Sequence, residues 1–181
     1  MKFYKNYFEE IVAYDFLTKF IFKQSSDFPK ITKIILSLEY KNPSSIQLIS
    51  SLLALEIIGI QKASLITTSK PNINIKIRKG QPIGCKVTLR NTNIYNFLSN
   101  FLLIILPQDR QLKPIQIKNK KSYNLSLKFN GILTFSELEN YYQFFKLISN
   151  LSVVIVTNSN SLAEFLFLLV SLKLPCVKKI I

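Results

Sequence analysis

Residues 76–90 constrain the fold more than any other part of this chain, because a basic stretch, a turn with glycine and proline, and a second basic stretch follow one another directly. Successive side chains of a strand point to opposite faces. In residues 84–90 this alternation predicts that Cys85, Val87 and Leu89 face a core. The opposite face would then carry Lys86, Thr88 and Arg90. The segment is therefore predicted to form a hairpin of two basic strands with one buried and one cationic face.

The positive charge of the chain is concentrated in its middle. The 181 residues include 24 Lys or Arg and 10 Asp or Glu, a formal net charge of +14. Between Ile57 and Ser136 there are 13 basic residues and a single acid, Asp109, so this block alone contributes +12. Such a block indicates a polyanionic partner, either nucleic acid or an acidic membrane surface. Scattered lysines would only solvate a surface, but this block falls on predicted strands, which favours nucleic acid.

The available side chains exclude most catalytic and metal chemistry. The chain has no His, and its two cysteines, Cys85 and Cys176, lie far apart in apolar surroundings. Without His, two cysteines cannot complete the usual four-ligand zinc site, and no Cys/His or Ser/His nucleophile pair is possible. We therefore predict no enzymatic activity, no cofactor, no metal site, and buried free thiols.

Hydrophobic periodicity and capping residues predict an alternation of helices and strands along the whole chain. The predicted elements, in order, are a helix over 3–22, a strand over 31–39, a helix from the cap Asn42 and Pro43 to Gly59, extended chain over 65–90, a helix from Asn91 and Thr92 to Pro107, a polar connection over 108–121, a strand over 125–129, a short helix over 137–149, an inner strand over 151–157, and a helix from the capping box of Ser161 and Glu164 through Leu172, ended by Pro175.

Each predicted helix has an apolar stripe that we expect to face the core. The stripes are Tyr4, Tyr7, Phe8, Ile11 and Tyr14 in the first helix, Ile46, Ile49, Leu53 and Ile57 in the second, and Tyr95, Leu98, Phe101, Leu102 and Ile105 in the third.

The order of elements predicts an α+β fold, a single domain over residues 1–181 with one antiparallel sheet, helices packed on one face, and a basic RNA-binding face. Lysine and arginine on that face would bind phosphates, while Asn and Thr would serve for sugar and base contacts. The residues expected on it are Lys33, Lys76, Arg78, Lys86, Thr88, Arg90, Asn124, Ser126 and Lys128.

The sequence shows no export or membrane signal. The first ten residues have neither an apolar signal-peptide core nor the Arg-rich, acid-poor pattern of a transit peptide, so the protein is expected to be made where it works. The longest candidate apolar run, residues 165–170, is far shorter than the roughly 18 residues of a membrane span. We expect no membrane insertion.

Residues 76–90, with the sequence KIRKGQPIGCKVTLR, resemble the signature segment of large-subunit ribosomal protein five, the 5S rRNA-binding protein of the central protuberance. Further similarity runs along essentially the whole chain. It includes the aromatic N-terminal helix, residues 33–37, Gln61 and Lys62 before residues 65–67, Ser126 with Phe135 and Glu137, residues 153–157, Ala163 with Glu164, and Pro175.

The resemblance implies partners and site residues. It implies a sheet that grips 5S rRNA and large-subunit rRNA, a protruding loop that reaches the peptidyl-site tRNA, a bridge to the small-subunit head protein thirteen, and neighbouring proteins of the central protuberance. The residues implied for rRNA are Lys33, Ser37, Gln61, Lys62, Thr67, Lys86, Thr88 and Arg90. Those implied for tRNA are Lys70, Asn72, Asn74, Lys76 and Arg78.

The chain also departs from the family pattern. Ser37 stands where the family has an Asn that bonds RNA, one residue is inserted around residues 59–64, and the tRNA loop is one residue shorter. Lys128 and Gly131 interrupt a Gly and an acidic position of the pattern. The 5S rRNA contact is therefore expected either to persist in altered form or to be replaced by another RNA or protein surface.

Composition points to an organellar genome. Only three Arg accompany 21 Lys, and Ile, Asn, Phe and Tyr, which have AT-rich codons, are abundant. We therefore expect an organelle-encoded structural protein of the large ribosomal subunit, in the mitochondrial matrix first and the plastid second. The alternative from another class is a basic peripheral membrane or protein-interaction module.

Overall fold

The computed structural model describes residues 3–41, 43–74, 76–108, 115–118, 123–129, 132–148 and 150–174, with the backbone alone for 115–118. Its contacts divide the chain into two compact units, each described by itself below. Unit 1 consists of Met1–Ile34, Arg90–Leu127 and Val154–Ile181, and unit 2 of Ile35–Leu89 and Lys128–Val153. The expectation of a single domain over 1–181 stays a prediction. Several predicted features, at Asn42, Ile75, Asp109, Gly131, Pro175 and Cys176, lie outside the described residues.

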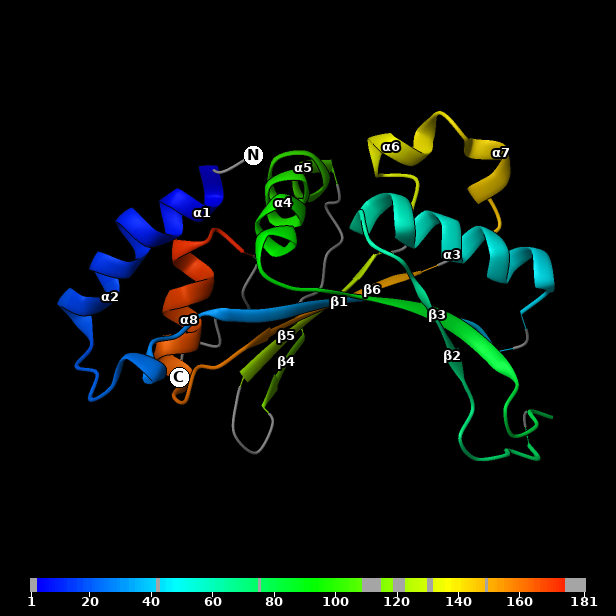
Figure 1. Ribbon diagram of the computed structural model, residues 1–181, viewed down its shortest axis with the longest axis horizontal. Helices are drawn as coiled ribbons and strands as arrows, with labels where there is room; N and C mark the ends of the chain where they lie inside the picture. The colour runs from blue at the N-terminus through cyan, green and yellow to red at the C-terminus, as the bar shows by residue number, and fades with distance from the viewer. Residues whose placement is uncertain are drawn as a thin grey trace. The chain divides into compact units, whose positions relative to one another are not determined.

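The described strands form an open antiparallel sheet in the order β2-β3-β1-β6-β5-β4 (Figure 1). The strands are β1 (Ile31–Glu39), β2 (Ser64–Thr67), β3 (Pro82–Leu89), β4 (Ile115–Lys118), β5 (Tyr123–Phe129) and β6 (Leu151–Thr157). The bounds of β1 and β6 and the inner position of β6 agree with the prediction, and the α+β class is confirmed. One correction concerns residues 108–121, which were predicted as a connection but contain β4, antiparallel to β5.

The helices cover the remaining predicted elements. They are α1 (Phe3–Tyr7), η1 (Phe8–Val12), α2 (Ala13–Lys19), a short 3-10 turn η2 (Ser25–Asp27), α3 (Ser45–Gly59), α4 (Thr92–Asn100), η3 (Phe101–Ile105), α5 (Leu106–Gln108), α6 (Ser136–Glu139), α7 (Tyr142–Phe145) and α8 (Leu162–Ser171). The single helix predicted over 137–149 is thus two short ones. Pro107 lies inside α5 rather than after the helix.

In unit 1, the N-terminal helix packs through an aromatic cluster. Phe16 is fully buried, and its ring meets that of Phe167 edge to face at 4.7 Å between centroids. The Tyr7 hydroxyl donates to the Ser171 carbonyl at 3.1 Å. The predicted stripe was partly wrong, because Ile11 and Tyr14 are exposed. The π-helical turn η1 is wider than an α-helical turn and rotates the helix, so the buried side chains are Phe8, Val12 and Phe16.

In unit 2, α3 buries its small residues rather than its large ones. The helix begins after Ser44, whose hydroxyl accepts from the Gln47 N–H at 3.3 Å in a capping box, so the predicted cap at Asn42 was wrong. The predicted stripe was also wrong, since Ile46, Ile49 and Leu53 are exposed. The buried positions are Ser50, Ser51, Ala54, Leu55 and Gly59. The helix is apolar nearly all round, so small side chains that allow close approach to β3 decide which face is buried.

The strand β3 lies against β1 so closely that only glycine fits at Gly84. A Cβ there would lie 2.2 Å from the Leu38 carbonyl oxygen and 3.1 Å from the Glu39 Cα. The Tyr40 N–H donates to the Ile83 carbonyl at 2.9 Å beside this point. A Cβ would therefore have to push two strands apart, because backbone atoms cannot rotate away as side chains can.

We predict that Gly84→Ala lowers the free energy of unfolding by about 1 to 3 kcal/mol, the usual cost of overpacking. Urea unfolding measures it. The matched control is Gly59→Ala, whose new Cβ would meet the Val87 Cγ1 at 3.0 Å, an atom that a side-chain rotation can move. The control should cost much less, because alanine also favours the helix. Equal losses in the two variants would contradict the argument.

Candidate nucleic-acid interface

The strand β3 separates a buried face from a cationic one, as its alternation predicted. Cys85, Val87 and Leu89 are at most 2% exposed and pack toward α3. Burial raises the pKa of Cys85 to about 11, so its thiol is protonated at neutral pH. Lys86 is exposed and Thr88 half-buried. The strand thus holds a cation on a rigid element whose other face is fixed in the core.

The partner of β3 is β2 rather than residues 76–79, which corrects the predicted hairpin. Ser64 pairs with Lys86 and Ile66 with Gly84 in antiparallel register, and the Ser64 hydroxyl donates to the Lys86 carbonyl at 3.2 Å. Lys76 and Arg78 belong instead to the loop that joins the two strands. The alternation of isoleucines that suggested a strand there is an alternation within a turn.

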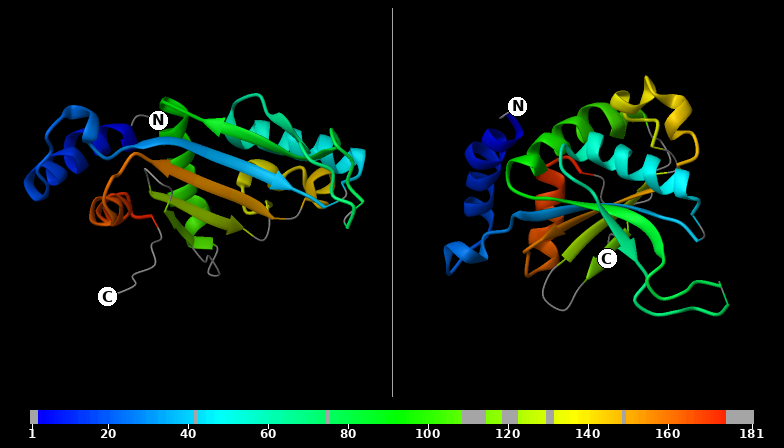
Figure 2. Two further views of the ribbon diagram at one scale, coloured as in Figure 1. Left: turned by 90° about the horizontal axis from the view of Figure 1, so that it is seen from below. Right: turned by 45° about the vertical axis from the view of Figure 1, so that its right-hand side comes forward.

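Hydrogen bonds give this loop, residues 68–81, a defined shape. The Thr68 N–H donates to the Gln81 carbonyl at 3.0 Å, and the Thr68 hydroxyl to the Arg78 carbonyl at 2.6 Å. Farther out, Asn72 and Ile77 exchange two backbone hydrogen bonds of 3.0 Å. The loop thus forms a small second ladder beyond the β2–β3 pair, and Figure 2 shows it extending from that pair.

Exposed cations and amides surround the loop. Lys76 has a φ of 56° and Gly80 a φ of 81°, so the chain reverses at two points in the left-handed region. The side chain of Ile73 at the tip is 90% exposed. The exposed polar side chains are those of Lys70, Asn72, Asn74, Lys76, Arg78 and Lys79. Ile73 and Lys79 were not predicted as site residues, and no sequence signal separated them from their neighbours.

The remaining predicted site residues divide between the two units. In unit 2, Gln61, Lys62 and Thr67 are exposed beside β2, and Ser37 is half-buried on β1. In unit 1, Lys33 is half-buried and Arg90 is exposed. Two residues expected on the polar face were wrong. Asn124 and Ser126 are 6% and 9% exposed, so β5 is buried on both faces at these positions, whereas Lys128 is exposed.

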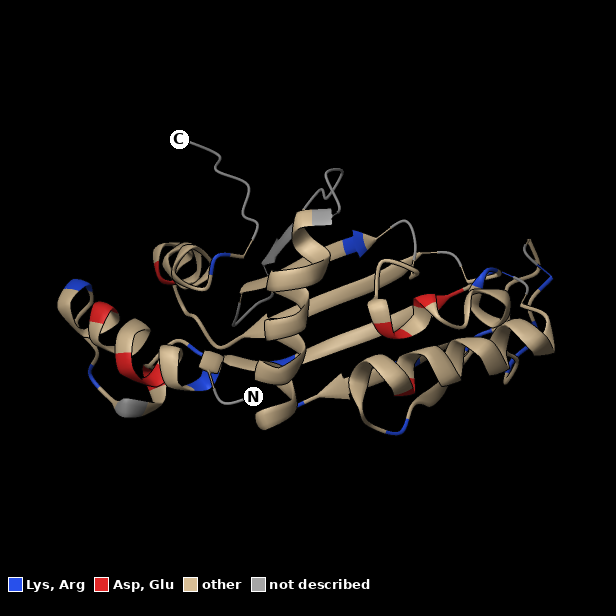
Figure 3. Cartoon of the chain, turned by 90° about the horizontal axis from the view of Figure 1, so that it is seen from above, with Lys and Arg blue, Asp and Glu red and all other residues tan. Residues whose placement is uncertain are grey.

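The helical layer of unit 2 carries a second, chemically different surface. Leu53 and Ile57 of α3, Glu137 of α6, and Tyr141, Phe144 and Phe145 around α7 line a cavity of about 500 Å³. Tyr141 and Phe144 are more than half exposed. The helices α3, α6 and α7 contain Glu56, Glu137 and Glu139 but no Lys or Arg (Figure 3). Acidic and apolar side chains do not favour RNA, so this surface suits a protein.

Two further searches concern other chemistries. Among the residues that the structure describes, no group of three or more Cys, Asp or Glu is placed to hold a metal ion. Within the same residues, none of the helices combines the length and apolar character needed to cross a membrane.

Comparison with known proteins places this arrangement in a family. The model for the C-terminus of the ribosomal protein uL5 family matches residues 82–176, which include β3. The chain is 36% identical over 178 residues to "Large ribosomal subunit protein uL5m" of Reclinomonas americana, covering 97% of this chain and 98% of the relative. It is 30% identical to "Large ribosomal subunit protein uL5" of Nitrosomonas europaea, covering 93% of this chain and 95% of the relative. It is 33% identical to the protein of the same name in Clostridium perfringens, covering 93% and 94%. The chain therefore belongs to the ribosomal protein uL5 family, whose members are structural ribosomal proteins and not enzymes, as the resemblance of residues 76–90 implied.

Proposed function

We propose that this chain is a structural constituent of the large subunit of an organellar ribosome and binds rRNA, either 5S rRNA or its replacement, in the central protuberance. The observation that carries the proposal is the division of β3 into a buried face and a cationic face, with exposed Gln61, Lys62 and Lys86 on one hairpin. Lysines on a strand and amides beside them suit phosphate and sugar contacts. The name of the relative in Reclinomonas americana supports a mitochondrial ribosome, with the plastid as second choice.

The finer contacts follow from the two other surfaces. The cationic loop that carries Lys70, Asn72, Asn74, Lys76 and Arg78 is the proposed contact with peptidyl-site tRNA. It is held in shape by its own hydrogen bonds, so binding requires little additional ordering. The acidic and apolar helical layer of unit 2 is the proposed bridge to the small-subunit head protein thirteen. Charge supports this assignment, since proteins that bind rRNA are basic.

We predict that Lys86→Ala combined with Arg90→Ala weakens rRNA binding and flattens its salt dependence. Each phosphate contact contributes about 0.7 to 0.9 to the log–log slope. The double variant should therefore reduce the slope by about 1.5, measured by filter binding to 5S rRNA and to large-subunit rRNA over a range of salt concentrations.

The control for this measurement is Lys146→Ala, which removes an exposed lysine after α7 in unit 2. It should leave the slope nearly unchanged. A slope that falls equally in the control and the double variant would show that bulk charge, not the sheet face, controls binding.

Neutralising the loop should affect tRNA more than assembly. We predict that Lys70→Gln, Lys76→Gln and Arg78→Gln together reduce retention of peptidyl-site tRNA, because three exposed cations of the loop are lost. The carbonyls and N–H groups that hold the loop are unaffected, so particles should still assemble. Sucrose-gradient profiles and tRNA occupancy of purified ribosomes measure the two effects. Failure of the particles to assemble would assign the loop to rRNA instead.

The helical layer of unit 2 can be tested by a charge at its apolar centre. We predict that Phe144→Asp impairs subunit joining but leaves the unfolding transition nearly unchanged, because the ring is 68% exposed. Leu103→Asp, at an equally exposed position of unit 1, is the control. Light-scattering measurements of subunit association report the effect, and normal association with the Phe144 variant would remove this surface from the bridge.

A further inference from the structure

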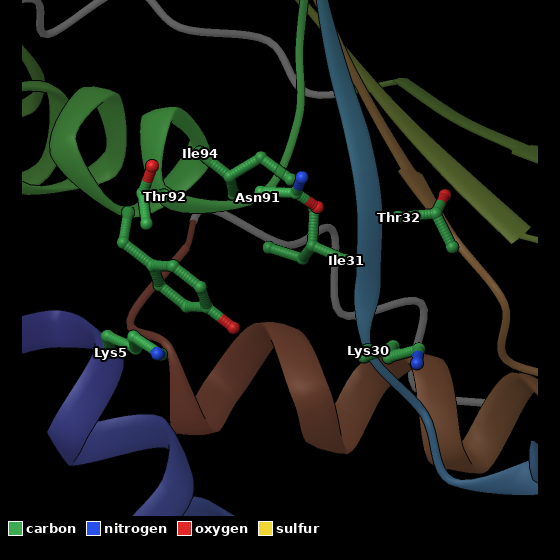
Figure 4. Close-up of a pocket in the computed structure, with 8 residues that line it drawn as sticks. Lys5, Lys30, Ile31, Thr32, Asn91, Thr92 and Ile94 are labelled. Atoms are coloured by element: carbon green, nitrogen blue, oxygen red, sulfur yellow. The ribbon is translucent and has the colours of Figure 1, made fainter.

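Unit 1 contains a polar pocket of about 480 Å³ that none of the predicted contacts uses. Three separate segments line it, and Figure 4 shows Lys5 on α1, Lys30 and Ile31 at the start of β1, and Asn91 and Thr92 at the start of α4. Thr32, Ile94 and Tyr95 complete the lining. A pocket of this volume is within the usual range for small-molecule and cofactor sites, about 300 to 1,000 Å³.

The β1 side of the pocket is held in place by the residues after β6. The Lys30 N–H donates to the Asn158 side-chain oxygen at 2.7 Å, and the Asn158 amide donates to the Phe28 carbonyl at 3.1 Å. The Thr32 hydroxyl donates to the Val156 carbonyl at 3.0 Å. These bonds fix the backbone from which Lys30 and Ile31 project, so this wall exists before any ligand binds.

The floor of the pocket is apolar and aromatic. Ile94 is 3% exposed, and Ile31 and Tyr95 are half-buried. The Tyr95 ring packs on that of Phe8, with centroids 6.2 Å apart. Burial, with a smaller effect of Glu9, raises the pKa of Tyr95, so the phenol keeps its proton and can donate to an anionic oxygen. A flat apolar group would find a fitting surface here.

The rim of the pocket is cationic, with no carboxylate among the lining residues. Lys30 is exposed, and the Lys5 Nζ lies 3.7 Å from the Glu9 Oε1 in a pair that is about half exposed on both sides. Such an exposed pair contributes little, so the Lys5 ammonium can turn to another anion. Two ammonium groups, hydroxyls and an amide beside an aromatic floor are complementary to a phosphate attached to a flat ring.

We propose that this pocket binds one unstacked nucleotide of RNA, with its phosphate between Lys5 and Lys30 and its base on the floor formed by Ile31, Ile94 and Tyr95. Bases of RNA loops and bulges are commonly splayed out and received in this way. The inference rests on the proposed role as an rRNA-binding protein and adds to it a contact outside the β2–β3 hairpin. It gives unit 1 a recognition site for a single base.

The experiment is a titration of the full ¹⁵N-labelled chain, followed by amide shifts, with 5′-AMP, 5′-UMP, ribose 5-phosphate and inorganic phosphate. We expect the nucleotides to shift the amides of Ile31, Thr92 and Tyr95 saturably. They should bind about tenfold more tightly than ribose 5-phosphate, the size of effect expected for one base–aromatic contact. Equal binding of ribose 5-phosphate or inorganic phosphate would reduce the pocket to a phosphate site and overturn the proposal, as would the absence of saturable shifts.

Two variants make the result specific. Lys30→Gln should weaken 5′-AMP binding several-fold, whereas Lys23→Gln, at an exposed lysine of the same unit that does not line the pocket, should not. Equal effects would show non-specific charge attraction and overturn the proposal. The outcome is separable from the proposed function, because the salt dependence of the Lys86 and Arg90 variant is measured with rRNA. An unaltered slope there would count against rRNA binding by the sheet, whatever the nucleotide titration shows.

Discussion

The close approach of β3 to β1 at Gly84 is the constraint on which unit 2 depends. With no Cβ at this position, the strand comes within a distance of the Leu38 carbonyl that no other residue could reach. The two strands stay in contact past this point through the bond from Tyr40 to Ile83. Since side chains alternate along β3, fixing Gly84 also fixes which residues are buried and which reach solvent. The position of Lys86 is therefore a consequence of a backbone contact two residues earlier.

The same strand explains why unit 2 has two surfaces of opposite character. Its apolar face is covered by α3, which presents small residues to it and leaves its large ones outside. The outer side of α3 thus contributes Leu53 and Ile57 to an apolar cavity beside Glu137, while the hairpin carries the lysines. Opposite charges on separate sides of one unit let it bind RNA and a protein together, because neither partner has to displace the other.

The sequence predicted best where a single periodicity decided the structure. For β1, β3 and β6, alternating side chains gave the buried residues correctly, because a strand has only two faces. Helix faces were harder. In α3 apolar side chains surround the axis, so periodicity could not show that Ser51 and Gly59 would be inside. Near Phe8 and Phe101 π-helical turns change the phase of the stripe, and no local residue pattern announced them.

The candidate site was predictable in its charge but not in its shape. Residues 72–78 alternate Ile with polar residues as a strand does, yet the left-handed backbone at Lys76 turns the chain back on itself. The first arm of the predicted hairpin therefore became the tip of a loop, and β2 took its place. This exchange separates the cations by the element that holds them. Lys86 is fixed by a sheet, whereas Lys76 and Arg78 are carried by a loop with its own hydrogen bonds, and such a loop can adjust to a partner that comes and goes without disturbing the contact that the sheet makes.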